Sequence, residues 1–394
     1  MTDFAKESVA LHSQLHGKLE VKSKVGLNDR RDLSLAYTPG VAQVCHEIHQ
    51  APERVFELTL KHNTVAVVSD GSAILGIGNL GPEAAIPVME GKAVLFKEFA
   101  NVDAFPICLA TQDVDEIVRA VRLIAPVFGG VNLEDIAAPR CFEVEERLQD
   151  LGIPVFHDDQ HGTAIVVLAA LINALKVAGK KLDECTIVFN GSGASAIACC
   201  RLILSYGELG KAPKPGDVIM CDTKGIVHRG RTDLNDYKKD IAGRTNKHNL
   251  SGSLADAMKG ADIFIGLSQG NLVSQEMVRS MNKHPIILAM ANPTPEIMPD
   301  AARDAGAAVI GTGRSDFPNQ INNVLAFPGV FRGALDAHAK VVNEDMKIAA
   351  SEALAEYVIE PTPERIIPEA LDKQVALRVG KAVEAAAKRT GVCR

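Results

Sequence analysis

The chain has 394 residues, which exceeds the size of one ordinary hydrophobic core and predicts two domains. Hydrophobic residues make up 47% and charged residues 23% of the sequence, a composition typical of a globular enzyme and not of a disordered or fibrous chain. The formal net charge of −7, with basic residues scattered along the chain, argues against a nucleic-acid partner and against binding to an anionic membrane.

Cysteine placement and the length of apolar runs bear on the cellular compartment. The 8 cysteines mostly lie inside apolar stretches and form no C-x-x-C pair, and we expect no secretory signal at the start of the sequence. Such thiols are typical of reduced, cytoplasmic proteins. No run approaches the roughly 18 uninterrupted apolar residues of a membrane-spanning helix. The sequence therefore predicts a soluble, cytoplasmic protein.

The first half of the chain alternates between strand and helix patterns. A short amphipathic helix is expected over residues 4–16, followed by an irregular polar stretch to about residue 40 that ends in a turn at 37–40. Strands are then expected at 64–70, 104–110, 127–133 and 153–156, and helices at 81–99, 113–125 and 138–152. This alternation predicts parallel strands covered by helices.

The second half repeats the alternation after a long apolar helix at 162–179. Strands are expected near 185–190, 217–222, 262–266, 285–290 and 307–311, followed from about residue 333 by an Ala-rich helical tail that packs on one of the two sheets. The predicted fold class is α/β. It consists of two domains, 1–160 and 161–394, each with a largely parallel sheet flanked by helices, the second one Rossmann-like and doubly wound.

A glycine-rich turn joins the strand at 185–190 to the following helix. Gly191, Gly193 and Ala196 fill the pattern G-x-G-x-x-G/A, in which the glycines permit a tight turn and a close approach of backbone to a pyrophosphate. The alternative is a tight strand-to-helix turn without a ligand. The predicted dinucleotide-binding residues are Gly191, Ser192, Gly193, Ala194, Ser195 and Ala196.

Asp222 ends the next predicted strand, where a carboxylate can accept hydrogen bonds from the adenosine ribose and so favours NAD. It lies 26 residues after Ala196, farther than the usual separation of about 20, and a polar insert before the strand accounts for the excess. Lys224, Arg229 and Arg231 follow closely and could contact the 2′-phosphate of NADP. Both nucleotides stay open.

Two pairs of carboxylates follow predicted strands of the first sheet. Glu134 and Asp135 close the strand at 127–133, while Asp158 and Asp159 stand in front of the apolar helix. One aspartate could cap that helix, but a cap explains only one of them. Because neighbouring parallel strands end at the same edge of a sheet, we expect these carboxylates to converge. Converging carboxylates repel one another unless a cation lies between them, and oxygen ligands suit Mg²⁺ or Mn²⁺.

Two further features allow both an ordinary and a functional interpretation. His157 and His161 have the spacing of zinc ligands, but no H-E-x-x-H motif or cysteine set accompanies them, so we do not expect zinc. Lys92 is flanked by apolar residues on a predicted helix. It is either a surface lysine with a buried stem or a lysine withdrawn from water that serves as a general base.

Eight motifs in order give the chain a resemblance to the malic enzyme family, in its short bacterial form. They are "YTPGVA" (37–42), "SDGSAILGIGNLGP" (69–82), "PVMEGKAVLFK" (87–97), "NLEDI" (132–136), "FHDDQHGTA" (156–164), the glycine-rich turn (191–196), "ANPTPEI" (291–297) and "INNVLAFPG" (321–329). The resemblance implies oxidative decarboxylation of malate to pyruvate and CO₂, with hydride transfer to NAD or NADP and dependence on Mg²⁺ or Mn²⁺. It also implies a catalytic, metal- and substrate-binding first domain and an NAD(P)-binding second domain.

The resemblance further implies roles for individual residues. Tyr37 is similar to the family's general acid and Lys92 to its general base, and Asp158 to the carboxylate that pairs with this lysine. The implied metal ligands are Glu134, Asp135 and Asp159; the implied substrate-binding residues are Asn292 and Asn323, of which Asn292 also lines the nicotinamide.

One position departs from the family pattern, since many members carry a carboxylate-binding arginine where this chain has Ala73. The cation, the asparagines or a group from a neighbouring subunit would have to replace it. We expect a homodimer with the N-terminal segment as a candidate contact, and a small molecule, malate or pyruvate, as the other partner. Two alternatives remain: a malolactic activity that releases lactate, and a catalytically decayed nucleotide-binding subunit.

Overall fold

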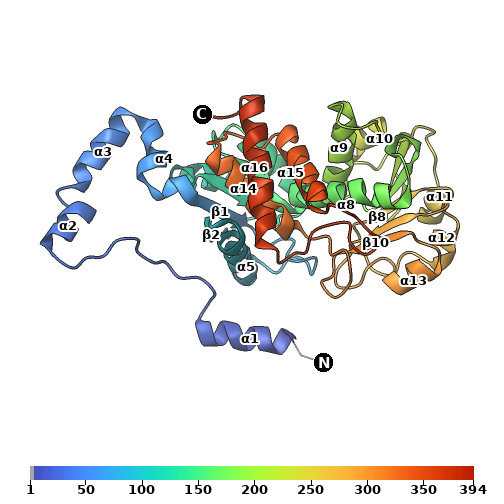
Figure 1. The fold of residues 1–394 in the computed structure, drawn as a ribbon, viewed down its shortest axis with the longest axis horizontal. Coiled ribbons are helices and arrows are strands. Elements are labelled where there is room, and N and C mark those ends of the chain that lie inside the picture. Colours follow the sequence, from blue (N-terminus) through green and yellow to red (C-terminus); the bar gives the residue numbers. More distant parts are fainter. Residues whose placement is uncertain (1–3) are drawn as a thin grey trace.

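The computed structural model describes residues 4–394 and contains two parallel sheets, each covered by helices (Figure 1). The first sheet has the strand order β2-β1-β3-β4, and all its neighbours are parallel. Its strands are β1 (Thr64–Ser69), β2 (Asp103–Cys108), β3 (Gly130–Leu133) and β4 (Val155–His157). The β-branched run of β1 is buried along its whole length, as expected for a strand covered on both faces.

The helices of this first unit are α5 (Pro82–Ala100), α6 (Val114–Ile124) and α7 (Arg140–Leu148). Helix α5 contacts β1 and β2, and α6 packs on α7. Asp113 caps α6 by accepting the backbone N–H of Glu116, and Asn101 ends α5 in the left-handed conformation.

The second sheet has the order β10-β9-β8-β5-β6-β7 and is parallel except for its short edge strand β7 (Gly225–Ile226), which is antiparallel to β6. Its other strands are β5 (Thr186–Asn190), β6 (Asp217–Asp222), β8 (Ile263–Gly266), β9 (Ile286–Ala289) and β10 (Val309–Thr312). The surrounding helices are α9 (Ala194–Glu208), α10 (Asp236–Arg244), α11 (Leu254–Met258), α12 (Gln275–Arg279) and α13 (Pro299–Asp304). The predicted α/β fold class is confirmed.

Helix α8 (Thr163–Ala178) joins the two units and is mostly buried. Together with the preceding turn it forms a segment, Asp158–Ala178, that has the length and apolar composition of a membrane span. Its apolar residues are interrupted by Asn173 and Lys176, so it is no uninterrupted run of 18, and it was not singled out from the sequence. Moreover, 61% of its apolar window is buried inside the protein, as in the core helix of a water-exposed domain.

The Ala-rich tail forms α14 (Phe327–Asp336), α15 (Glu344–Tyr357) and α16 (Lys373–Thr390). Helices α14 and α16 contact α5 of the first unit, and α15 contacts α8. Phe327 and Phe331 of α14 meet Phe96 of α5 edge-on, with ring centroids 4.8 and 5.3 Å apart. The tail thus returns to the first sheet, while the division of the chain near residue 160 stays a prediction.

Residues 4–50 form an N-terminal arm that extends away from the sheets (Figure 1). It consists of α1 (Phe4–Leu15), α2 (Arg30–Ala36) and α3 (Val41–Gln50), and none of these helices buries a residue. The short elements η1 (Pro52–Arg54), α4 (Val55–Leu58) and η2 (Leu60–Asn63) connect it to β1. The expected irregular stretch is wrong over α2, because Asp29 caps that helix by accepting the backbone N–H of Asp32.

Candidate active site

Three carboxylates meet at the carboxyl edge of the first sheet. Glu134 and Asp135 follow β3 directly, and Asp159 lies in the π-helical turn η4 (Asp158–Gly162), which follows β4. One ligand oxygen from each of the three residues lies within 4.8 Å of the others. Strands β3 and β4 are parallel neighbours, so both end at the same edge of the sheet. The residues that follow them are therefore brought together.

Hydrogen bonds hold these carboxylates in place. Asn132 Nδ2 donates to Glu134 Oε2 at 2.9 Å, and the backbone N–H of Asp135 donates to Asp159 Oδ2 at 2.8 Å. Asp135 adopts φ = 54°, a left-handed conformation that aspartate tolerates better than most residues. Ala73, at the position of the missing arginine, donates its backbone N–H to the Asp135 carbonyl at 2.9 Å.

The cluster has more negative charge than its surroundings compensate. Burial, together with the neighbouring charge of Asp159, raises the pKa of Asp135 to about 7. Burial and the surrounding carboxylates also hold the pKa of Glu134 well above its usual range, although Lys92 opposes them. Asp135 Oδ2 is buried without a hydrogen-bond partner. An oxygen-only donor set with an unpartnered, buried carboxylate oxygen fits Mg²⁺ or Mn²⁺.

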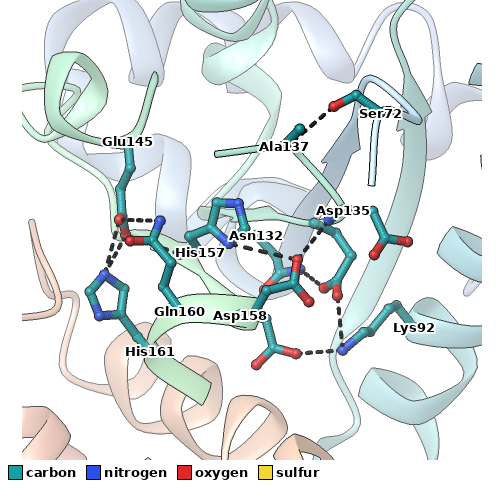
Figure 2. A network of polar contacts seen from close by, with 12 residues as sticks. Ser72, Lys92, Asn132, Asp135, Ala137, Glu145, His157, Asp158, Gln160 and His161 are labelled. Carbon is teal, nitrogen blue, oxygen red and sulfur yellow. Dashed lines mark hydrogen bonds and ion pairs between the residues drawn. The ribbon is translucent and has the colours of Figure 1, made fainter. Parts of the chain in front are cut away.

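Lys92 of α5 lies beside this cluster and not at the surface. Its ammonium group makes a short ion pair with Asp158 and lies 3.3 Å from Glu134 Oε1 (Figure 2). It also lies 4.3 Å from the centroid of the Phe327 ring. The side chain is 11% exposed, which contradicts the interpretation as a surface lysine with a buried stem.

The pair of Lys92 and Asp158 is electrostatically coupled to the cluster. Burial by itself lowers the pKa of Lys92, but the charges of Asp158 and Glu134 outweigh it and raise that pKa, so the lysine stays protonated. Burial raises the pKa of Asp158 to about 6, against the opposing charge of Lys92. The ammonium group of Lys92 is therefore the positive charge that partly compensates the carboxylates in the metal-free protein.

Gly162 allows the π-helical turn to pass close to Asp158 and Asn323. A Cβ atom at Gly162 would lie 1.8 Å from Asp158 Oδ1 and 3.2 Å from the Cβ of Asn323, so only glycine fits. Asn323 begins the short helix η6 (Asn323–Leu325), which contacts η4. The structure therefore brings the predicted substrate residue Asn323 next to the turn η4.

Neither nearby histidine belongs to the donor set, although His157 Nδ1 lies 3.9 Å from Asp159 Oδ2. His161 Nε2 is hydrogen-bonded to Glu145 of α7, and the ring of His157 is fully buried. Within the part of the chain that the structure describes, the one group able to hold a metal ion is Glu134, Asp135 and Asp159. Glu145 was missed from the sequence, although an acidic residue on the apolar face of its helix, next to Val144 and four residues after Cys141, was a usable signal.

The glycine-rich turn lies at the switch point of the second sheet, where β5 has β6 on one side and β8 on the other. Gly191 has φ = 126°, and a Cβ there would lie 2.6 Å from the carbonyl oxygen of Leu267, so the turn requires glycine. A Cβ at Gly193, by contrast, would meet nothing within 4 Å. The turn leaves open space at the start of α9, whose first residues are Ala194, Ser195 and Ala196.

Asp222 ends β6 as predicted but is already engaged by cations. Arg231 binds both of its oxygens, at 2.8 and 3.1 Å, and Lys238 Nζ lies 2.8 Å from Oδ2. Although burial opposes them, these contacts hold the pKa of Asp222 at about 2. Of the other basic residues considered from the sequence, Lys224 pairs with Asp233 and Arg229 contacts backbone carbonyls.

The two remaining predicted residues lie apart from the carboxylates. Asn292 follows β9 and is exposed at the carboxyl edge of the second sheet, where its Nδ2 would lie 2.8 Å from a Cβ at Gly313. Tyr37 lies at the end of α2 in the N-terminal arm and is 65% exposed. The structure therefore does not bring Tyr37 to Lys92 of the same chain (Figure 1).

Comparisons with known proteins match both units. Residues 16–149 match the malic enzyme N-terminal domain, and residues 160–388 match the malic enzyme NAD binding domain. The chain is 57% identical to the bifunctional malic/malolactic enzyme of Bacillus subtilis, over 99% of this chain and 94% of the relative. It is 48% identical to an NADP-dependent malic enzyme of Halomonas elongata, over 100% of this chain and 96% of that one. The crystal structure of an NAD-dependent malic enzyme from Thermotoga maritima superposes with a TM-score of 0.91 at 48% identity, covering 96% of this chain and 98% of that one.

Proposed function

The chain belongs to the malic enzyme family, and we propose that it catalyses the oxidative decarboxylation of malate to pyruvate and CO₂, with hydride transfer to NAD or NADP. One observation carries the proposal. The turn η4 presents Asp159 to the carboxylate cluster and Asp158 to Lys92, and the same turn packs against α9, the helix that begins at the glycine-rich turn. The turn η4 therefore connects the three parts of the proposed site: the carboxylates that could bind a metal, the buried base and the nucleotide-binding turn.

Glu134, Asp135 and Asp159 would hold Mg²⁺ or Mn²⁺ in this proposal. When bound, the cation supplies Lewis-acid stabilisation of the negative charge that develops on the C2 oxygen as CO₂ leaves. The oxygens of a small anionic substrate would also be attracted to this edge of the sheet by the bound cation. Asn323, next to Gly162, is placed to bind the substrate, and Ala73 itself supplies no guanidinium group.

Lys92 is the proposed general base, which takes the proton of the C2 hydroxyl of malate while hydride leaves C2 for the nicotinamide. The ion pair with Asp158 fixes the position of its amine. A base must be neutral, and Lys92 is protonated as long as the carboxylates beside it are uncompensated. Once those carboxylates are neutralised, burial favours the neutral amine.

Tyr37 is the proposed general acid that protonates C3 of enolpyruvate, and its position supports a homodimer in which a second copy supplies it. A groove of about 1040 Å³ follows the edge strand β2, between α5 and residues 19–24 of the arm. The arm itself exposes many apolar side chains: Phe4, Val9, Leu11, Leu15, Leu19, Val21, Val25, Leu27, Leu33 and Leu35. Apolar surface of this extent is typical of an interface between subunits.

Mixing two inactive variants tests this arrangement. If Tyr37 acts in the partner's site, a mixed dimer of the Y37F and K92M proteins has one intact site, formed by Lys92 of one copy and Tyr37 of the other. Random exchange makes about half of the dimers mixed, so the mixture should regain about one quarter of the wild-type rate. Mixed dimers without any recovered rate would contradict it.

The assay that tests the function itself uses purified protein with malate and Mn²⁺, and with NAD⁺ and NADP⁺ in parallel. Reduced nucleotide and pyruvate should form together, and EDTA should stop both. Because Asp222 is neutralised by Arg231 and Lys238, we expect turnover with both nucleotides. Nucleotide binding without turnover would instead support a decayed subunit.

A malolactic activity is the second candidate, since the Bacillus subtilis relative carries both activities in its name. Lactate formed from malate without accumulation of reduced nucleotide would identify it. Cytoplasmic localisation stays a prediction, and the 8 cysteines, all free, agree with a reducing compartment.

A further inference from the structure

The π-helical turn η4 has two faces with different tasks. Asp158 and Asp159 point to Lys92 and to the carboxylate cluster, and the His157 ring lies 3.9 Å from Asp159 Oδ2, whereas the side chains of Gln160 and His161 point toward Glu145 of α7 (Figure 2). A π-helical turn carries one more residue than an α-helical turn and is rarely stable without support from its surroundings. No side chain caps the turn at His157. Its support must therefore come from elsewhere.

Glu145 of α7 provides three contacts to that second face. Its Oε1 accepts the backbone N–H of His157 at 3.0 Å, and its Oε2 accepts Gln160 Nε2 at 3.2 Å. His161 Nε2 lies 2.9 Å from Oε1 and 3.0 Å from Oε2. Both oxygens of one buried carboxylate are thus used by residues that flank the two functional aspartates in sequence.

We propose that Glu145 is a positioning residue, which clamps the π-helical turn so that Asp159 and Asp158 face the metal site and Lys92. The inference deepens the proposed function and rests on it for the identity of the metal. Glu145 touches neither the carboxylate cluster nor Lys92 in any contact found in residues 4–394, so its effect would be transmitted through the turn alone.

The charge state of Glu145 suits this task. Burial alone would raise its pKa, but His161 and Lys347 hold it at about 2, so the group is an ionised, acceptor-only carboxylate at neutral pH. Lys347 belongs to α15, is buried, and pairs with Glu344 at 2.9 Å. The hydrogen bonds of Glu145 therefore join α7 to the turn, while Lys347 of the C-terminal tail acts on Glu145 only through its charge.

The isosteric variant Glu145→Gln tests the inference. Gln160 Nε2 and the His157 N–H are both donors, so an amide, which offers one acceptor oxygen and a donating NH₂ group, cannot satisfy both. Loss of a group that hydrogen-bonds a metal ligand directly typically weakens metal binding by about 10- to 100-fold. Glu145 acts one step farther out, through the turn, so the expected loss is at the lower end of that range, about 10-fold. We expect that loss in the affinity for Mn²⁺ alone, measured by electron paramagnetic resonance of the full-length protein.

Two further variants complete the experiment. Glu146→Gln makes the same change at the exposed next residue of α7 and should leave the Mn²⁺ affinity within about twofold of wild type. Gln160→Met removes one of the three contacts and should give a smaller loss than Glu145→Gln. It also keeps the inference testable if Glu145→Gln does not fold.

The outcomes separate this inference from the proposed function. A wild-type protein that binds no Mn²⁺ would overturn the metal site, and the inference with it. If wild type binds Mn²⁺ and Glu145→Gln or Gln160→Met binds it equally well, with only a lower melting temperature, Glu145 is merely structural and the inference is wrong. Weakened Mn²⁺ binding together with unchanged NAD⁺ affinity would support it.

Discussion

Replacement of Asp135 by asparagine should stabilise the metal-free protein, although it removes a proposed metal ligand. Asp135 is buried, and burial and the charge of Asp159 raise its pKa to about 7, from 3.8 for an unperturbed aspartate. The folded state therefore retains a proton that the unfolded chain releases above pH 3.8. Because the folded state binds more protons, its stability falls as the pH rises between these two values.

The size of the effect follows from that pKa difference. At about 1.4 kcal/mol per pKa unit, the difference between about 7 and 3.8 corresponds to about 4 kcal/mol at pH 8. The Asp159 side chain is 33% exposed, so solvent screens part of its repulsion, and we expect about 2–4 kcal/mol. Asparagine has the shape of aspartate but no charge. The extra free energy of unfolding of the Asp135→Asn protein, relative to wild type, should be near zero at pH 4. It should grow up to pH 7 and remain constant above it.

Urea unfolding in EDTA at several pH values between 4 and 8.5 measures this difference. Asp304→Asn, at an exposed position of α13, is the control and should change the free energy of unfolding by less than about 0.5 kcal/mol. Saturating Mn²⁺ should reverse the order, since it stabilises wild type more than the variant. If Asp135→Asn is less stable than wild type in EDTA at pH 8, the carboxylate is not destabilising and the electrostatic argument fails.

Other predictions concern the residues beside Asp135. Asp159→Asn should lose Mn²⁺-dependent turnover of malate with an unchanged far-UV circular dichroism spectrum, and full activity would refute its role as a ligand. Lys92→Met should lower kcat by about 100- to 10,000-fold while NAD⁺ still binds in calorimetry, whereas Lys97→Met on the exposed side of α5 should not. Gly162→Ala should lower both kcat and the melting temperature, because its Cβ would lie 1.8 Å from Asp158 Oδ1; Gly243→Ala, with nothing within 4 Å, should be tolerated. An active, equally stable Gly162→Ala protein would show that Asp158 need not sit where the structure has it.

Several features of the site could be predicted because they depend on local sequence. The strands of both sheets except the short edge strand β7, the glycine-rich turn and the placement of Glu134, Asp135 and Asp159 at strand ends follow from periodicity over a few residues. The convergence of the carboxylates needed one further rule, that parallel neighbouring strands end at the same edge. Expected boundaries differ from the observed ones by a few residues, as for β3, which begins at Gly130 and not at 127.

Other features depend on contacts between segments far apart in the chain, which periodicity does not contain. Lys92 and Asp158 are 66 positions apart, and only the packing of α5 on the first sheet decides that the lysine is buried as an ion-pair partner. Glu145 and Arg231 are closer in sequence to the groups they contact, 12 positions from His157 and 9 from Asp222, but these contacts follow no helix or strand period either. The arm is the opposite case, since its helices form locally and find no surface of the same chain to cover them.

The amino-acid sequence by itself therefore determined the two-sheet α/β architecture and the candidate carboxylates, because hydrophobic periodicity and strand-end chemistry are local properties. The tertiary structure alone decided which of these groups are buried, which are paired, and that Tyr37 lies outside the site of its own chain. Burial and pairing set the charge state of each group, and they arise only when distant segments pack together.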